Sequence, residues 1–309
     1  MQTAEWALVI YTILIQMAVG AFLILGAMHV LAYRKAGAEE ADRLSARALY
    51  AIGPVVVIGV LASMLHLGNP LNSYKVLSNI GSSWLSREIA MTILFGGLGA
   101  VFALLQWRKI GSFAVRTVVA VLTAIAGIGL VFSMSQIYML PTQPAWNTFG
   151  TPVQFFTTAL LLGSLAGGAA LVANYAYLRS RGEGACLETQ GELLCTSIRW
   201  IVILAVALLG VELIVFPITI AYLAAGPVEA VQSAAKLFGE FGVLTVLRVL
   251  LVFVGAGVFG LFLYRRLRDN SPENFPAALV YGAFALVLIG EVVGRFLFYA
   301  THVGINIGV

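Results

Sequence analysis

The sequence has few charged residues: Asp, Glu, Lys and Arg make up only 10% of it, against about a quarter of an average globular chain. Hydrophobic residues make up 61%, and the mean hydropathy is +0.97. A soluble domain cannot bury that much apolar surface, so an ordinary soluble enzyme is excluded. The net charge of +4 is no sign of a nucleic-acid partner, because in a membrane protein the information lies in where Lys and Arg are placed.

Cysteine and histidine are also scarce. The two cysteines, Cys186 and Cys195, form no CxxC pair, and we expect both to be free thiols. The histidines are His29, His66 and His302. So few ligands exclude an iron–sulfur site in this chain and leave His66 and His302 as the one pair for a haem. We expect no haem or metal in this chain.

Long apolar runs fill most of the sequence. The first run has no basic residue before it and is too long for the apolar part of a signal peptide, so we expect it to stay in the membrane. A bilayer core takes about 20 apolar residues per helix, and eight runs have this length. They are residues 6–33, 49–67, 86–107, 112–139, 153–178, 197–222, 241–264 and 277–302. The sequence therefore predicts an all-α integral membrane protein, with eight transmembrane helices in one domain over residues 1–309.

Basic residues divide the connections into two sets. The first, third, fifth and seventh hold eleven Lys and Arg residues, whereas the second, fourth and sixth hold only Lys75 and Lys236. Basic connections stay in the cytoplasm. Both termini are therefore predicted to lie outside, on the face of the membrane opposite the cytoplasm.

Two of the outer connections have unusual compositions. Residues 140–152 carry three prolines and a tryptophan, which indicates either a rigid interfacial cover or an ordinary loop. Residues 227–238 begin with a proline and place apolar residues near helical spacing. This pattern fits either a short surface helix or an ordinary interfacial loop.

Ionisable side chains inside the spans cost roughly 3 kcal/mol each on insertion scales, so each needs an explanation. With the predicted orientation, eight such residues fall in the outer half of the membrane, and only His29 stands out in the inner half. They are Arg87, Glu88, Glu212, Arg248, Glu291 and Arg295, with His66 and His302 at the ends of the second and eighth spans. Their shared depth favours an outer polar site.

Spacing adds detail to this site. Glu291, Arg295 and His302 are four and then seven residues apart, which places them on one helical face. Pro217 frees the carbonyl of Leu213 beside Glu212, as often happens where a helix lines a cavity. Structural explanations stay open: Glu291 and Arg295 have the spacing of a packing pair, and Glu88 has the place of a first-turn acid facing the helix dipole.

A one-sided polar pocket in an apolar bundle suits an amphipathic, lipid-soluble substrate such as a quinol. Its oxidation releases two protons with two electrons, and histidine ordinarily exchanges protons near neutral pH. We expect His66 to accept a proton, Glu88 to pass it outward and Arg87 to hold Glu88 ionised. Four further residues would shape the polar floor: Glu212, Arg248, Glu291 and Arg295. The electrons would leave to a cluster in a partner on the outer loops.

The same residues carry a family resemblance. The stretches are ASMLHLGNP (62–70), LSREIA (85–90), PAWNTFGTPVQFF (144–156), GVEL (210–213) and GEVVGRFLFYATH (290–302). In this order they resemble the membrane-anchor subunits of dimethyl sulfoxide reductase complexes, the DmsC-type anchors. Trp84 and Arg87 stand where family members can carry other residues.

The resemblance implies an eight-helix, haem-free subunit of a bacterial cytoplasmic (inner) membrane, with both termini on the periplasmic side. Such a subunit binds menaquinol and holds two peripheral subunits in a heterotrimer. One partner carries four 4Fe–4S clusters. The other carries a molybdopterin centre that reduces S-oxides or N-oxides. The quinol-site histidine of the family corresponds to His66, and its acidic partner corresponds to Glu88.

Three alternatives remain open on the sequence. A proton-translocating subunit of the polysulfide-reductase type would need polar residues in the inner half, where little stands out beyond Gln16 and His29. A one-haem cytochrome b would use His66 and His302. A proton-coupled secondary transporter would use Glu212 and Glu291 and would work without peripheral subunits.

Overall fold

The computed structural model describes residues 3–65, 70–182, 184–267 and 276–305, with the backbone alone in 3–5, 70–74 and 184–186. All regular structure in these residues is helical. In chain order the elements are α1 (Thr3–Tyr50), α2 (Ile52–Met64), the 3₁₀ helix η1 (Pro70–Asn79), α3 (Trp84–Arg108), α4 (Phe113–Ile137), α5 (Gly150–Ser180), α6 (Gly184–Ala224), α7 (Val228–Phe238), α8 (Gly242–Val252), the π-helix η2 (Phe253–Phe259), α9 (Gly260–Arg266) and α10 (Ala277–Ala300).

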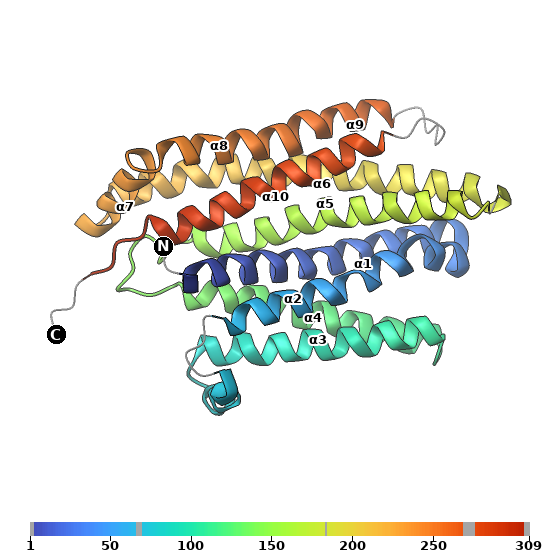
Figure 1. Cartoon of the computed structure of the whole chain (residues 1–309), viewed down its shortest axis with the longest axis horizontal. Coiled ribbons are helices and arrows are strands. Elements are labelled where there is room, and N and C mark those ends of the chain that lie inside the picture. Colours follow the sequence, from blue (N-terminus) through green and yellow to red (C-terminus); the bar gives the residue numbers. More distant parts are fainter. Residues whose placement is uncertain (1–2, 66–69, 183, 268–275, 306–309) are drawn as a thin grey trace.

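Seven candidate spans are found among the described residues, by length and apolar composition. The first, Trp6–Met64, is 59 residues long and covers the first predicted span and the second, 49–67, as far as residue 64. Inside α1, Gly37 has a φ of 85°, a backbone shape that glycine adopts far more readily than other residues. The chain turns there and α2 returns along α1 (Figure 1). The helical membrane fold is confirmed, with seven candidates where the sequence predicted eight.

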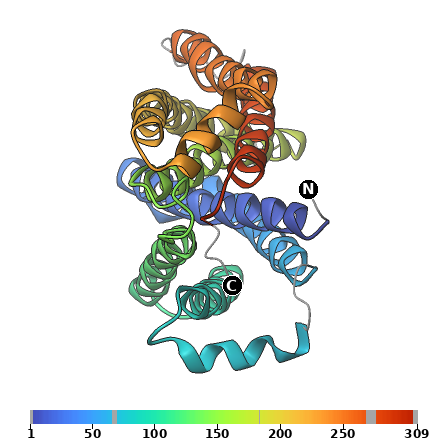
Figure 2. The same ribbon diagram turned by 90° about the vertical axis from the view of Figure 1, so that its left-hand side faces the viewer.

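The central layer of the molecule is formed by α1 and α5. In the most apolar stretch of the first candidate span, and in that of α5, 78% of residues are buried, against 11% for α3. Figure 2 shows α3 and α4 on one side of α1 and α6 to α10 on the other. A Cβ on Gly20 of α1 would lie 1.8 Å from the carbonyl oxygen of Ala159 on α5. Small residues therefore let these helices touch, as is common in membranes.

The two ends of the bundle differ in charge. The last turns of α3, α5 and α9 carry Arg108, Arg179, Arg265 and Arg266, and these helix ends lie together on the right of Figure 1. The start of α1 and the end of α10 lie at the opposite end, with α7 and the 138–149 connection. One end of the bundle is therefore basic, and the other end bears both chain ends.

Two distortions shape the second half of the chain. Pro217 lies inside α6, and the seventh predicted span is interrupted by η2. Helix α6 packs against η2 and α9, whereas α8 packs against α10. The 227–238 segment, for which a helix or a loop was expected, forms α7, which begins after Pro227.

Candidate functional site

Glu88 is a buried carboxylate near the start of α3. Ser83 caps this helix by accepting a hydrogen bond from the backbone N–H of Ser86, so the helix begins at Trp84 and Glu88 lies in its second turn. The predicted place in the first turn is wrong by one turn. Glu88 is 6% exposed, and it lies near Tyr11 of α1, whose hydroxyl shares a 3.3 Å hydrogen bond with Oγ1 of Thr92 on α3. A buried carboxylate without polar neighbours would be strongly destabilising.

His66, the predicted first proton acceptor, lies outside the described residues. Arg87 is described, and it points away from Glu88. Its guanidinium donates to the carbonyl oxygens of Ile80 at 2.9 Å and Gly81 at 2.7 Å, and it stacks 4.2 Å from the centre of the Trp84 ring. Among the described contacts, Arg87 makes no ion pair with Glu88. Its contacts fasten the turn before α3.

Arg248 of α8 joins two carboxylates. Its Nη2 lies 3.6 Å from Oε1 of Glu212 on α6 and 3.9 Å from Oε1 of Glu291 on α10. The Oγ1 of Thr158 on α5 donates to Oε2 of Glu291 at 2.6 Å. Helices that are distant in sequence thus bring three of the predicted site residues together. These charges keep little exposed surface, with side-chain values of 11% for Arg248, 12% for Glu212 and 2% for Glu291.

Arg295 does not form the packing pair that its spacing from Glu291 suggested. Its Nη2 donates to Oε1 of Gln16 on α1 at 2.9 Å, and its guanidinium lies 3.9 Å from the centre of the Phe155 ring on α5. Its Nε and Nη1 are buried without a hydrogen-bond partner among the described residues. Arg295 therefore faces the central α1–α5 layer.

The end of the second half that lies near both chain ends is closed by an aromatic cover. Trp146 donates from Nε1 to the carbonyl oxygen of Phe298 at 2.8 Å and stacks on His302 at 4.2 Å between ring centres. His302 lies beyond the end of α10 at Ala300, so the helix is shorter than the predicted span. The 140–152 connection, for which a cover or a loop was expected, packs here against α10.

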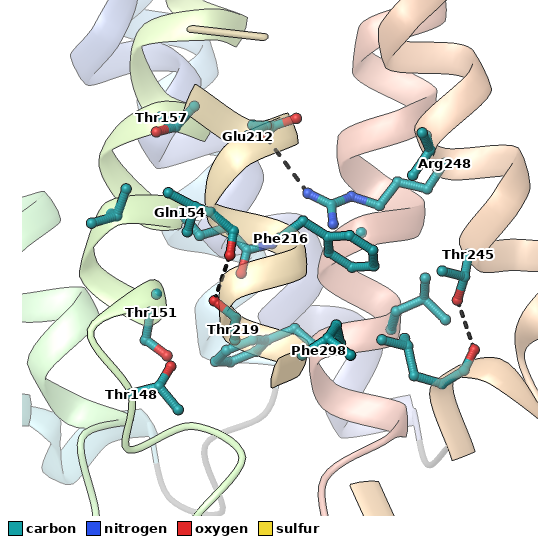
Figure 3. Close-up of a pocket in the computed structure, with 18 of the residues that line it drawn as sticks. Thr148, Thr151, Gln154, Thr157, Glu212, Phe216, Thr219, Thr245, Arg248 and Phe298 are labelled. Atoms are coloured by element: carbon teal, nitrogen blue, oxygen red, sulfur yellow. Dashed lines mark hydrogen bonds and ion pairs between the residues drawn. The ribbon is translucent and has the colours of Figure 1, made fainter. Parts of the chain in front are cut away.

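A cavity of about 270 Å³ lies below this cover, between α5, α6, α8 and α10. Figure 3 shows Glu212 and Arg248 pointing toward one another across it, with Phe216 and Phe298 nearby and several threonines around its wall. The wall also includes Trp146 and residues of α7. Glu88, on α3, is not among the lining residues.

The predicted site residues thus fall into two groups. Glu88 faces α1 from the α3 side, whereas Glu212, Arg248 and Glu291 meet on the α6–α8 side. Arg295 contacts the helices between these sides.

Several polar contacts escaped the sequence analysis. Tyr11, Thr158 and Gln16 lie in largely apolar runs, and their contacts with charged residues form only when the helices pack. The hydroxyls of Tyr138 and Tyr299 lie 2.5 Å apart, and both rings are held in the aromatic cluster of the cover. The 144–156 and 290–302 motifs, which carry the cover and Tyr299, were the available signal.

A separate polar cluster lies at the basic end. His29 shares a 2.8 Å hydrogen bond with Ser45, and its Nε2 lies 4.0 Å from Oδ1 of Asp42. Asp42 also contacts Lys109 and Gln106. Between His29 and Gln16, residues 17–28 of α1 contain no charged side chain. Within the described ranges, no group of three or more His, Cys, Asp or Glu residues is placed to hold a metal ion.

The fold and the buried charges first define the class of protein. It is a helical membrane protein whose buried charged side chains are concentrated in one half of the bundle. The family of DMSO reductase anchor subunits (DmsC) matches residues 1–301. The chain belongs to this family. The resemblance seen in the motifs is therefore confirmed, and with it the role of a membrane anchor subunit, which implies catalytic and electron-transfer partners.

Individual relatives match over nearly their whole length. The sequence is 30% identical to the C subunit of the anaerobic dimethyl sulfoxide reductase of Escherichia coli K12, over 99% of this protein and 97% of the relative. It is 29% identical to the YnfH subunit of an anaerobic dimethyl sulfoxide reductase of the same organism, with the same coverage. It is 28% identical to the corresponding C subunit of Haemophilus influenzae, over 98% of both proteins.

Proposed function

We propose that this chain is the quinol-oxidising anchor of a molybdenum-containing S- or N-oxide reductase complex of the dimethyl sulfoxide reductase kind. It is one polytopic domain that crosses a bacterial cytoplasmic membrane eight times, with both termini in the periplasm. It oxidises menaquinol near the periplasmic face. An iron–sulfur subunit with four clusters receives the electrons, and a molybdopterin subunit uses them.

The observation that carries this proposal is the family match over residues 1–301. The charge pattern supports the orientation, because the basic helix ends gather at the end opposite the chain ends. The return of α2 along α1 supports the count of eight, because it divides Trp6–Met64 into an outgoing and a returning segment.

Two residues carry the proton chemistry of this proposal. Menaquinol loses two protons and two electrons to become menaquinone. His66 accepts a proton from a ring hydroxyl, and Glu88 passes it to the outer water. The burial of Glu88 beside the hydroxyls of Tyr11 and Thr92 supports the second role, because a relay group needs polar neighbours that can exchange a proton with it. Electrons and protons leave on the same side, so this subunit pumps no protons.

The quinol site proposed here contains fewer residues than the sequence suggested. Arg87 lies at its border, where its hydrogen bonds hold the turn before α3. Arg295 lies behind it, in contact with the central layer of α1 and α5. Glu212 and Arg248 line the cavity on the other side of that layer, and Glu291 lies against Arg248 there.

The test replaces His66 with Ala and compares two electron donors on the intact complex. Turnover driven by a menaquinol analogue should fall at least about a hundredfold, the usual worth of acid–base catalysis. A reduced dye that feeds the peripheral subunits directly should still support the normal rate. Equal loss with both donors would show that the substitution acts on assembly instead.

A second measurement tests the complex itself. We expect the chain purified under mild conditions to bring iron, sulfide and molybdenum with it in stoichiometric amounts. Purification of an active chain without any of them would favour the secondary transporter.

A further inference from the structure

The cavity at Glu212 and Arg248 has a structural origin in two helix distortions. Pro217 and the start of η2 each lie roughly one and a half turns from the charged residue on the same helix, Glu212 and Arg248 respectively. A proline removes a backbone hydrogen bond, and a π-turn shifts the helix face. These changes let the outer half of α8 follow α10 while α6 stays with η2 and α9.

The charged end of the cavity is incompletely satisfied. The 3.6 Å between Arg248 Nη2 and Glu212 Oε1 exceeds hydrogen-bond length. The Oε1 atoms of Glu212 and Glu291 are buried without a hydrogen-bond partner in the described part of the sequence. Burying such groups unpaired is destabilising, and in native proteins they usually bind water or a ligand.

The charges select the kind of polar head that fits here. An anionic head would meet the Glu212 carboxylate and compete with two carboxylates for Arg248. A cationic head would lie against Arg248 itself. A hydroxyl group suits both sides, because it donates to Glu212 while its oxygen accepts from Arg248.

The rest of the cavity suits an apolar body. Its wall is largely apolar and includes Phe216, Val249 and Leu297. Val211 and Leu213 of α6 line the cavity and are also 37% and 44% exposed. The cavity therefore reaches the lateral surface of the bundle, where an apolar tail would meet lipid.

We propose that this cavity binds a neutral amphiphile whose hydroxyl-bearing head bridges Glu212 and Arg248 and whose tail leaves sideways along α6. The chemistry is shared by the ring hydroxyl of a quinol and by a neutral glycerol-headed or sugar-headed lipid. The site lies apart from Glu88, so it does not depend on the function proposed for His66 and Glu88.

The test compares two substitutions of equal size on α8. Val249→Phe fills the cavity, whereas Val246→Phe changes a residue that is 59% exposed and does not line it. Intact complexes are purified in mild detergent, and the bound amphiphiles are extracted and counted per complex by mass spectrometry. We expect the unchanged protein and Val246→Phe to hold about one more neutral hydroxyl-bearing amphiphile per complex than Val249→Phe.

A second variant keeps the test decisive if Val249→Phe fails to assemble. Glu212→Gln keeps the volume and removes the charged acceptor, so binding should weaken about tenfold, as for one lost hydrogen bond to a charged group. The extracted mass separates a quinol from a neutral lipid, and either supports the site. An anionic phospholipid, an empty unchanged protein, or equal occupancy in the two phenylalanine variants would overturn it.

Discussion

The backbones of Gly20 on α1 and Gly163 on α5 pack directly against each other: a Cβ added to Gly163 would lie 2.1 Å from the carbonyl carbon of Gly20. Gly163→Ala must therefore push the central helices apart. We expect a loss of about 1–3 kcal/mol in the free energy of unfolding, as for an overpacked core, measured by unfolding titration in mixed micelles. Gly97→Ala on α3 is the matched control, because its Cβ meets nothing within 4 Å. Equal effects of the two changes would contradict this account of the α1–α5 contact.

Glu88→Gln tests the proton relay apart from His66. The amide keeps the size of the side chain and removes its ability to take up a proton. Quinol-driven turnover should fall about a hundredfold while dye-driven turnover stays normal. Glu240→Gln makes the same chemical change at an exposed outer position and should alter neither rate. An unchanged quinol-driven rate in Glu88→Gln would remove this residue from the mechanism.

Arg248→Met tests the balance of the buried charges. It leaves two carboxylates without their cation, so we expect a loss of about 3–5 kcal/mol in the free energy of unfolding. Adding Glu212→Gln and Glu291→Gln should recover most of that loss, because the remaining groups are then neutral. Arg108→Met, at an exposed arginine in the last turn of α3, should cost much less. Additive losses across the triple variant would mean that the three residues are not coupled.

The proposed orientation makes a labelling prediction. In a background with Cys186 and Cys195 replaced by Ser, single cysteines are placed at Glu240, beyond α7, and at Arg181, after α5; both positions are exposed. A thiol reagent that cannot cross the membrane should label position 240 in intact cells. It should label position 181 only after the membrane is opened. The reverse pattern would invert the topology.

An absorption spectrum tests the haem alternative. We expect the dithionite-reduced chain, purified without its partners, to show no sharp b-type band. A band that disappears in both His66→Ala and His302→Ala would instead establish the histidine pair as haem ligands.

Much of the fold was predictable because apolar length and helix punctuation are local properties. Residues 112–139 enclose α4, and a proline before an apolar pattern made a helix one of the two alternatives at α7. The π-helix at Phe253–Phe259 had no such signal, because its cause lies in packing against other helices. The joining of α1 and α2 into one candidate span likewise depended on a helical stretch within a polar connection.

The buried charges of the spans could be found in the sequence, but their partners could not. The free-energy cost of placing a charge in the membrane identified four residues: Glu212, Arg248, Glu291 and Arg295. Which side chains pair, however, depends on how each helix is rotated about its axis. Spacing therefore suggested Glu291 with Arg295, whereas Arg248 faces Glu291 and Gln16 faces Arg295. Tyr11 could not be found, because a tyrosine in an apolar run resembles any other aromatic residue until α3 packs against α1.

The aromatic cover can form completely only late in the synthesis of the protein. The N–H of Val303 donates to Oγ of Ser233, and the N–H of Ile305 donates to the carbonyl oxygen of Thr142. The 140–152 connection and α7 are made earlier and already pack together at Ala145, but these two hydrogen bonds need residues that follow the last span. This face of the protein is therefore completed only after every helix has been inserted, and a partner that docks on it meets a finished anchor.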